Sequence, residues 1–562
     1  MKIQKIISLE EFKQQLIMKN YNRIQKLFVK TFSIIAISIS FSCDVEPEIY
    51  SEVLPEEFFQ TPDQLASAAA VAYLPLSGYW AMTAENSEVV SDVATVAVRS
   101  NNGWDDGGVW PNLMSHSGWT SQLGQTSTTW NNMTSGVSTC NRLIEVFSAS
   151  AGVDSPGVAE LRALRAFYYY KLLSAYGNIP IESRFSDADP NPSQVAPQVA
   201  FDFIENELKE SIPLLSEDKN SITYGKINKW AGNAILSDLY LNSERITGVA
   251  KWNEAASAAN VVINDGGYGL EAGYFSNFRA QNDGSQENIW VIPYERNIFG
   301  GFQVRMQALH QSAPGTFDLT DTPWGGFAFQ TEFYESFEED DLRKGMFIVG
   351  QQYTSKAGPV WNNTTGFGYA SPSDEYKLEN CVEDYDNYTP EFQPSLDGGC
   401  NIFITPDYNE IDGRYPYRHG ARWGKFEMPV GETYDISTDF PIYRLAGIML
   451  NRAEALWRQD NASTEALTLV NQIRFRAGLS DLSSLTEDDL YHEFKKEMAL
   501  EGFSRDITIR FGHWEDDWFL KGIGDMKGSP STNTADVTRR VFPIPYAALL
   551  SNSNLVQNPG YN

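Results

Sequence analysis

Two pairs of neighbouring amphipathic segments, roughly 200 residues apart, constrain the fold of this 562-residue chain more than any other feature. Apolar residues recur with helical period over four stretches: 227–241, 252–263, 445–458 and 464–477. In the second pair, small alanines among the larger apolar residues allow two antiparallel helices to pack closely. Each pair is similar to a tetratricopeptide unit, but the long separation excludes a regular solenoid. The sequence therefore predicts a discontinuous helical scaffold.

Two further helices have recognisable ends. Ser155-Pro156 supplies a capping hydroxyl and a first-turn proline, and the apolar face that follows stops at Gly177. Thr486 is a second capping residue, and its helix is expected to run to Gly502.

Loop-rich sequence separates these helical segments. Residues 80–130 and 268–440 are dominated by Gly, Asn, Asp, Pro and aromatic residues, and short apolar runs such as 289–292 predict brief strands. Long ordered loops on a rigid scaffold usually carry function. The alternative is that they serve only in packing.

The N-terminus predicts export. Seven basic residues precede an uncharged apolar stretch from Thr31 through Phe41, which is about half the length that spans a bilayer, and Ser42-Cys43 follows. We interpret residues 1–42 as a signal peptide, with Met18 as its true start, and Cys43 as the lipidated first residue of the mature protein. Cleavage elsewhere without a lipid is the alternative. Residues 43–562 are then expected to form a single composite domain.

Charge and cysteine content exclude several functions. The chain has 43 Lys and Arg against 73 Asp and Glu, a net charge of −30, so it lacks the basic balance that nucleic-acid binding needs. No CxxC motif is present for zinc or redox chemistry. Cys381 and Cys400 flank a loop and are candidates for a disulfide, whereas Cys140 is expected in the core.

Several sequence blocks resemble the SusD/RagB family of glycan-binding outer-membrane lipoproteins, in the order of that family across nearly the whole mature chain. The blocks are Glu160–Tyr169 with Tyr176–Pro180, Ile227–Ala231 with Leu239–Asn242, Tyr443–Ala446 with Asn451–Ala455, Asn471–Gly478, Glu501–Asp506, Pro543–Pro545 and Gln557–Tyr561.

The resemblance implies a mainly α fold with tetratricopeptide-like helix pairs as scaffold, a few short strands and a large loop-rich face for ligand. It also implies a lipid-anchored protein at the cell surface that captures oligosaccharide or polysaccharide for nutrient uptake. Its partner would be a SusC-like TonB-dependent transporter in the outer membrane. On physical grounds most motif residues are structural, and the Arg452-Ala453-Glu454 segment is expected to form ion pairs between helices.

Candidate glycan contacts lie in the loops, because sugar rings stack on aromatic faces and their hydroxyls bind planar polar groups. The resemblance places contacts in the early loop, approximately at Trp104 with Asn101 or Asn102. The loop composition adds five more candidates: Asp92, Arg99, Tyr294, Trp324 and Trp361. Asp92 and Arg99 fit a structural salt bridge equally well, and Trp104 fits a core role if its ring points inward.

Two other functions stay open. A secreted glycoside hydrolase would need two placed carboxylates, which an acidic chain always offers, but no catalytic motif is present and we expect no enzyme activity. A peptide-binding tetratricopeptide scaffold would leave the Trp-rich loops unexplained. We expect no cofactor. Asp187, Asp189 and Asn191 mimic the opening of a calcium loop, but Pro192 stands where that loop needs Gly. A structural cation is the alternative to a chain without bound metal.

The sequence does not identify the glycan. The net charge disfavours polyanions, unless a basic cluster at Arg414, Arg418 and Arg422 overrides it.

Overall fold

Helices are the main secondary structure in this computed structural model, which describes residues 62–100, 103–116, 118–370, 400–408, 415–432, 434–522 and 536–561. Residues 59–562 form one packed unit. The predicted signal peptide, Met18, Cys43 and Cys381 lie outside the described residues, so the lipidation and disulfide hypotheses stay predictions. Within the described ranges, no helix has both the length and the apolar character needed to cross a bilayer.

The helices, in chain order, are α3 Pro62–Val71, α4 Tyr79–Thr83, α5 Val109–Ser115, α6 Gly124–Ala151, α7 Pro156–Tyr176, α8 Pro197–Ser211, α9 Lys229–Leu241, α10 Ser243–Thr247, α11 Trp252–Asp265, α12 Val304–Ala308, α13 Pro314–Phe317, α14 Thr331–Glu335, α15 Leu445–Gln459, α16 Thr464–Arg476, α17 Glu487–Met498, α18 Ser504–Arg510, α19 Phe519–Gly522 and α20 Tyr546–Ser551. Short turns of other helix types are η1 Leu74–Gly78, η2 Ala84–Glu88, η3 Asp106–Gly108, η4 Ile212–Leu214, η5 Tyr274–Phe278, η6 Leu342–Met346, η7 Ser355–Ala357 and η11 Val537–Arg540.

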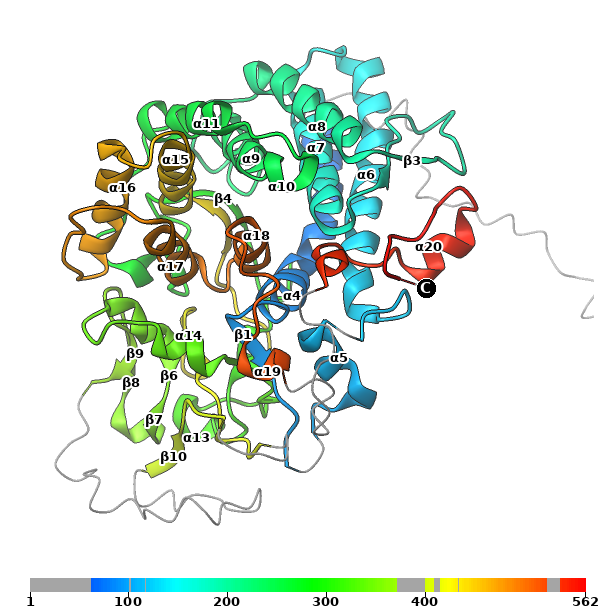
Figure 1. The fold of residues 1–562 in the computed structure, drawn as a ribbon. Coiled ribbons are helices and arrows are strands. Elements are labelled where there is room, and N and C mark those ends of the chain that lie inside the picture. Colours follow the sequence, from blue (N-terminus) through cyan, green and yellow to red (C-terminus); the bar gives the residue numbers. More distant parts are fainter. Residues whose placement is uncertain are drawn as a thin grey trace, which may run out of the picture. The chain divides into compact units, whose positions relative to one another are not determined.

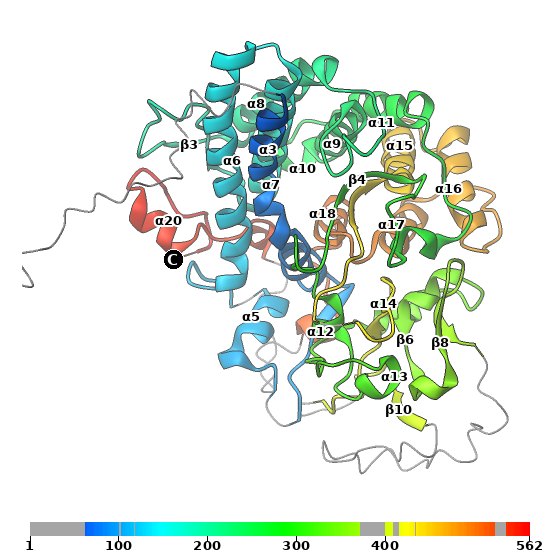
Figure 2. The same ribbon diagram turned by 180° about the vertical axis from the view of Figure 1, so that it is seen from behind.

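Both predicted helix pairs are confirmed, as α9 with α11 and α15 with α16. Although the pairs are far apart in sequence, α11 packs directly on α15, so the two pairs join into one helical layer (Figures 1 and 2). Ala255, Ala258 and Ala259 are buried on α11, as is Ala455 on α15. Small side chains on both helices permit this close approach.

The long helices α6 and α7 pack against each other beside this layer, with α8 on the other side of α7 (Figure 2). The predicted start of α7 is confirmed, because the Ser155 hydroxyl accepts a hydrogen bond from the Val158 amide, and the helix ends before Gly177. A Cβ atom on Gly136 of α6 would lie 2.4 Å from the Tyr168 ring of α7. Glycine therefore allows the two helices to approach closely.

The region 80–130 is more helical than its composition suggested. It contains most of α4, all of α5 and the start of α6, none of which sequence periodicity indicated.

Helix α17 also differs from the prediction. Thr486 and Asp489 form a capping box at its start, but it ends at Met498 rather than at Gly502, and Leu500 then takes a left-handed φ of 64°.

The region 268–440 contains short antiparallel strand pairs, as expected. Of the strands in the described residues, β4 to β11 lie within this region, and the full set is β1 Ala94–Val96, β2 Ile179–Pro180, β3 Gln194–Val195, β4 Asn288–Ile292, β5 Phe327–Phe329, β6 Phe347–Ile348, β7 Gly350–Tyr353, β8 Pro359–Asn362, β9 Gly366–Tyr369, β10 Cys400–Ile404, β11 Arg422–Trp423 and β12 Phe440–Arg444. They pair as β1–β5, β2–β3, β4–β12, β6–β11, β7–β10 and β8–β9. Strand β4 confirms the strand predicted at 289–292. Strands β6–β10 lie at the end of the unit opposite α8, α9 and α11 (Figure 1).

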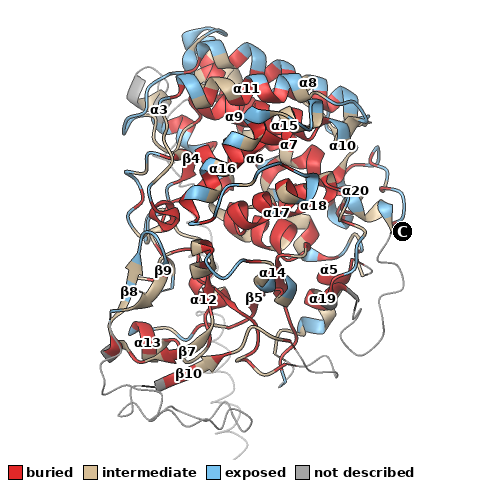
Figure 3. Cartoon of the chain, turned by 60° about the vertical axis from the view of Figure 1, so that its left-hand side comes forward, coloured by how far each residue is buried: buried red, intermediate tan, exposed pale blue. Residues whose placement is uncertain are grey.

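A network of buried ion pairs lies where α15, α16 and α17 meet the strands. The Arg444 guanidinium is fully buried and binds Glu287, Glu497 and Glu501 at N–O distances of 2.6–2.8 Å. Arg343, Lys425 and Arg476 share these acidic partners. Residues around this network are mostly buried, whereas the outer faces of α8 and α11 are exposed (Figure 3).

The Arg452-Ala453-Glu454 segment forms the ion pairs between helices that were expected. Arg452 pairs with Glu465 of α16 at 2.6 Å, and Glu454 pairs with Arg510 of α18 at 2.9 Å.

Cys140 is buried and free, as predicted for a core thiol.

Candidate functional site

The exposed end of an aromatic cluster in the loops is the best candidate site. Trp324 is half-buried, and its ring meets the ring of Tyr434 edge to face at 5.6 Å. Tyr434 is 39% exposed. Two aromatic rings at the surface, set at 70° to each other, offer the apolar side of a shelf on which a sugar ring can stack.

Backbone hydrogen bonds hold Trp324 in place. Its amide donates to the carbonyl of Met306 at 2.7 Å, and the Gly326 amide donates to the carbonyl of Gln307 at 2.9 Å. Gly325 between them has a φ of 69°, so the loop 324–326 turns sharply where a side chain would be strained. The loop is therefore fastened to α12.

Trp104 supports this loop from beneath. Its Nε1 donates to the carbonyl of Trp324 at 3.0 Å, and its ring packs against Trp110 and Phe327. A Cβ atom on Gly326 would lie 2.2 Å from the Trp104 ring, which shows that the ring lies directly against that backbone. Trp104 has a left-handed φ of 63° and stands next to the turn of η3. The ring is half-buried, and its contacts are those of a residue that positions Trp324.

Arg99 also acts on this loop. Its side chain is fully buried, and its two terminal nitrogens donate to the carbonyls of Gly325, Gly326 and His419 at 2.9–3.0 Å. Arg422 is buried too and donates to the Gly325 carbonyl at 3.0 Å. These two arginines thus join the loop to residues 417–422 and are not surface groups. Arg414 lies outside the described residues.

Polar groups surround the aromatic pair. Arg296 and Glu432 form an ion pair at 2.6 Å, and Asp435 Oδ2 accepts the Gly301 amide at 3.1 Å. Burial, together with the nearby carboxylates of Asp435 and Asp321, raises the pKa of Tyr434. The phenol therefore remains protonated and can hydrogen-bond to a ligand hydroxyl.

Among the described residues, no three His, Cys, Asp or Glu side chains gather as a metal site.

The remaining predicted residues lie elsewhere. Asp92 forms a salt bridge with Lys495 and accepts a hydrogen bond from the Tyr491 hydroxyl. The sequence alternative had named Arg99 as the salt-bridge partner, and the structure shows Lys495 instead. Tyr294 is 1% exposed, and its hydroxyl donates to the Ser77 carbonyl at 2.9 Å. Trp361 packs edge to face on Phe275 at 5.5 Å.

Two predicted residues, Asn101 and Asn102, are outside the described ranges. Tyr434 was missed by sequence reasoning. It follows Pro429, Gly431 and Glu432 in the loop before β12, which is the same aromatic-in-a-loop signal that selected Trp104.

Two sequence profiles match most of the chain. One, described as the SusD family, matches residues 286–561, and the other, described as starch-binding associating with outer membrane, matches residues 44–241. The chain belongs to the SusD family. Both profiles cover parts of the loop-rich regions, and the SusD family profile includes Trp324 and Tyr434.

Curated relatives of this SusD-family chain are distant in sequence. It is 26% identical over 418 residues to the starch-binding protein SusD of Bacteroides thetaiotaomicron, covering 72% of each chain. It is 23% identical over 573 residues to SusD-like protein P2 of Formosa agariphila, covering 95% of this chain and all of the relative.

Solved structures show that the SusD-family fold is shared. Surface glycan-binding protein A from Bacteroides thetaiotaomicron superposes with a TM-score of 0.66 at 18% identity, over 89% of this chain and all of that one. Surface glycan-binding protein A from Bacteroides uniformis gives a TM-score of 0.65 at 19% identity, over 89% of this chain and 99% of that one. The predicted mainly α fold with tetratricopeptide-like pairs is thereby confirmed.

Proposed function

We propose that this SusD-family protein is a non-catalytic glycan-binding lipoprotein of the outer-membrane surface. The observation that carries the proposal is the exposed Trp324–Tyr434 pair, which a loop network holds rigidly in place. Paired aromatic rings at the surface, beside polar groups that can bind hydroxyls, are the arrangement on which a sugar ring stacks. The relative from Bacteroides thetaiotaomicron is described as starch-binding, and one solved structure of similar fold is a complex with laminarihexaose.

Retention of the protein on polysaccharide gels tests this proposal. Starch and laminarin are the first two probes, followed by fructan and xylan. Trp324→Ala is expected to weaken retention by roughly 30-fold, because losing a binding hot spot typically costs about 2 kcal/mol or more. Phe475→Ala is the matched control, since Phe475 is an exposed aromatic on α16 (79% exposed). Equal retention of both variants, or no retention of the wild-type protein on any gel, would remove the proposal.

The lipid anchor belongs to the same proposal. We expect Cys43→Ala to leave the protein folded but released from membranes, because acyl chains are the anchor that the sequence offers. The variant should be measured in washed outer membranes from cells that lack the transporter. Finding it there in wild-type amounts would contradict lipid anchoring.

Delivery to a SusC-like TonB-dependent transporter completes the proposal. Affinity purification of the tagged protein from mild detergent should recover that transporter. Deleting the transporter should stop glycan uptake while leaving surface binding intact. No bound oligosaccharide should be cleaved, so release of reducing ends that a single Asp or Glu substitution abolishes would instead support the hydrolase alternative.

A further inference from the structure

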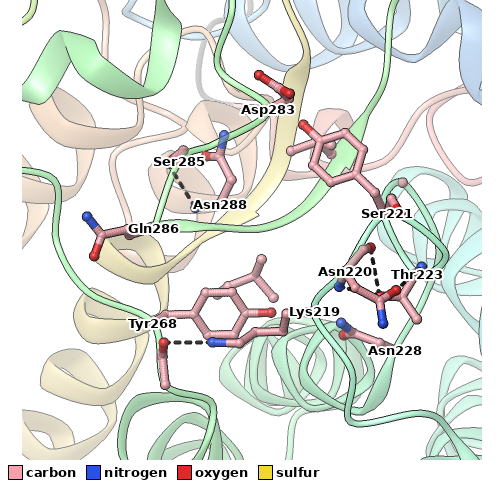
Figure 4. A pocket seen from close by; sticks show the side chains of 15 residues that line it. Lys219, Asn220, Ser221, Thr223, Asn228, Tyr268, Asp283, Ser285, Gln286 and Asn288 are labelled. Atoms are coloured by element: carbon pink, nitrogen blue, oxygen red, sulfur yellow. Dashed lines mark hydrogen bonds between the residues drawn. The ribbon is translucent and has the colours of Figure 1, made fainter.

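A cavity of about 530 Å³ opens beside β4, on residues that take no part in the aromatic site (Figure 4). Three segments line it: the loop 219–228 before α9, the turn at 267–268 after α11, and residues 283–291 leading into β4. Pockets of roughly 300–1,000 Å³ are the size that holds small ligands. The cavity is therefore large enough for a ligand of its own.

Neutral hydrogen-bonding groups dominate the lining. Amide and hydroxyl side chains come from two of the three segments, 219–228 and 283–291: Asn220, Ser221, Thr223, Asn228, Ser285, Gln286 and Asn288. Apolar contact is supplied by the rings of Tyr224 and Tyr268 and by two aliphatic side chains of β4. Polar groups that both donate and accept, next to flat rings, match the alternating hydroxyls and C–H faces of a sugar.

The charges around the cavity disfavour an anion. Lys219 is the cation of the lining, and its Nζ is already engaged, since it donates to the Gly267 carbonyl at 2.7 Å and lies 4.4 Å from the Tyr268 ring centroid. Figure 4 shows Lys219 lying alongside that ring, with Asp283 on the opposite side of the cavity. Asp283 is exposed, and Asp439 lies behind Tyr224, whose hydroxyl donates to it. A neutral ligand fits this field better than an acidic one.

Asn288 gives the cavity an unused recognition group. Its backbone is fixed in β4 opposite Arg444, and its amide N–H donates to the Ser285 hydroxyl at 3.3 Å. In contrast, the side-chain Nδ2 and Oδ1 are both buried and have no hydrogen-bond partner. Leaving an amide unpaired in this way costs about 1–3 kcal/mol. A turn of the side chain toward the cavity would let a ligand hydroxyl donate to Oδ1 and accept from Nδ2, which would offset that cost.

From these observations we infer that the cavity is a second binding site, for a neutral sugar unit, separate from the Trp324–Tyr434 site. The choice of a sugar rests on the proposed function, whereas the neutrality and the hydrogen-bonding character rest on the lining itself. A second site on one protein raises retention of a long polysaccharide through multivalency without tightening either contact.

Saturation-transfer NMR on the full chain with Trp324→Ala tests the inference, because this background removes the first site. The probes are free glucose, galactose, mannose and xylose, with glucuronate as the charged comparison. At least one neutral sugar should contact the protein, and adding Asn288→Leu should weaken that contact by about tenfold. The melting temperature should not fall, since the Asn288 amide has no partner to lose. Gln286→Ala, at the exposed rim, is a second variant in case Asn288→Leu misfolds.

Asn264→Ala is the matched control, because Asn264 is an exposed asparagine on α11 whose amide bonds only to Asn260. It should leave sugar contact unchanged. Three outcomes would overturn the inference: no contact with any neutral sugar, contact that Asn288→Leu and Gln286→Ala leave intact, or tighter binding of glucuronate. If Trp324→Ala abolishes polysaccharide retention and no sugar contacts the cavity, the second site is rejected and the proposed function stands. Unchanged retention in Trp324→Ala, together with a sugar bound in the cavity, would reject the Trp324–Tyr434 site and leave the cavity as the glycan-binding site.

Discussion

At the residue scale, the candidate site shows what a sequence can and cannot reveal about an aromatic side chain. Trp104 and Trp324 both stand in loops rich in Gly and Asp or Pro, and both were predicted glycan contacts. In the structure, the Trp104 ring lies against Gly326 while Trp324 reaches the exposed Tyr434. The Trp104 ring is held by a hydrogen bond to a residue 220 positions away, and the Trp324 ring meets Tyr434 in a distant loop, which local composition does not contain.

Trp104→Ala should therefore act mainly through the loop that it supports. The truncation removes a half-buried ring and the hydrogen bond to the Trp324 carbonyl, so we expect a loss of about 3 kcal/mol in unfolding free energy, at the low end for a Trp→Ala change. Glycan affinity should fall as well, because the Trp324 loop loses its support. Trp104→Phe keeps most of the packing and should recover stability more than affinity. Thermal unfolding and gel retention on the same samples separate the two effects, and an unchanged melting temperature in Trp104→Ala would contradict the supporting role.

Asp439 predicts a pH dependence of stability. Burial, with the carboxylates of Asp283 and Glu295 nearby, raises the pKa of Asp439 from 3.8 to about 7, although the Tyr224 hydroxyl donates to it. Between about pH 4 and pH 7 the folded protein holds a proton that the unfolded chain has lost. Stability should therefore fall as pH rises through this window, by at most about 4 kcal/mol from this residue.

Asp439→Asn removes that titration while keeping an oxygen for Tyr224. We expect the variant to gain melting temperature relative to the wild-type protein at pH 8 and to gain much less at pH 5. Burial also raises the pKa of Glu85 to about 7, but Glu85 is present in both proteins and cancels in the comparison. Equal shifts of melting temperature at the two pH values would contradict the prediction.

At the element scale, strongly periodic helices were predictable and polar ones were not. The two scaffold pairs and α7 have apolar faces or caps that the sequence displays. Helix α6 runs for 28 residues through a segment rich in Ser, Thr and Asn, with Gly136 in its interior. Residues of this kind have low intrinsic helix propensity. Its stability comes from packing on α7, and that tertiary contribution is invisible in the local pattern.

The ion-pair network between elements gives a prediction at the same scale. Arg444→Met should destabilise the protein by about 3–5 kcal/mol, because it leaves three buried carboxylates, just before β4, in α17 and in the turn after α17, without their shared partner. Arg452→Met is the matched control. Its partner Glu465 is half-exposed, so the cost of that change should be at most about 1 kcal/mol.

The destabilisation by Arg444→Met should also shrink in acid. Burial alone would raise the pKa of Glu497, but the guanidiniums of Arg476, Arg444 and Arg343 hold it well below its ordinary value. This contribution to stability is present above the ordinary pKa of about 4.5 and is lost as pH falls through the lowered pKa. Denaturant unfolding of both proteins at pH 7 and pH 3 measures the change, because pH 3 lies well inside the window between the two pKa values. A pH-independent difference would argue against an electrostatic origin.

At the scale of the whole molecule, the sequence blocks that resemble the SusD/RagB family meet in space. Asn558, in the C-terminal block, donates from Nδ2 to the carbonyls of Tyr176 and Phe542 at 2.8 Å. Glu88 near the start accepts the amides of Leu500 and Gly502 at 3.0 and 2.9 Å. These contacts connect distant parts of the chain, which explains why the motif residues that make them serve structure.

The packing of α11 on α15 also fixes when this protein can fold. The apolar face of α11 remains uncovered until nearly 200 further residues have been made and brought back to it, so the contact order is high and folding should be slow. A chain that stops before α15 should stay unfolded or aggregate. Limited proteolysis of a chain ending at Gly431 would reveal this as complete digestion. For a chain that is exported as its N-terminus predicts, we expect a holding chaperone to keep the first half from aggregating until the second half arrives.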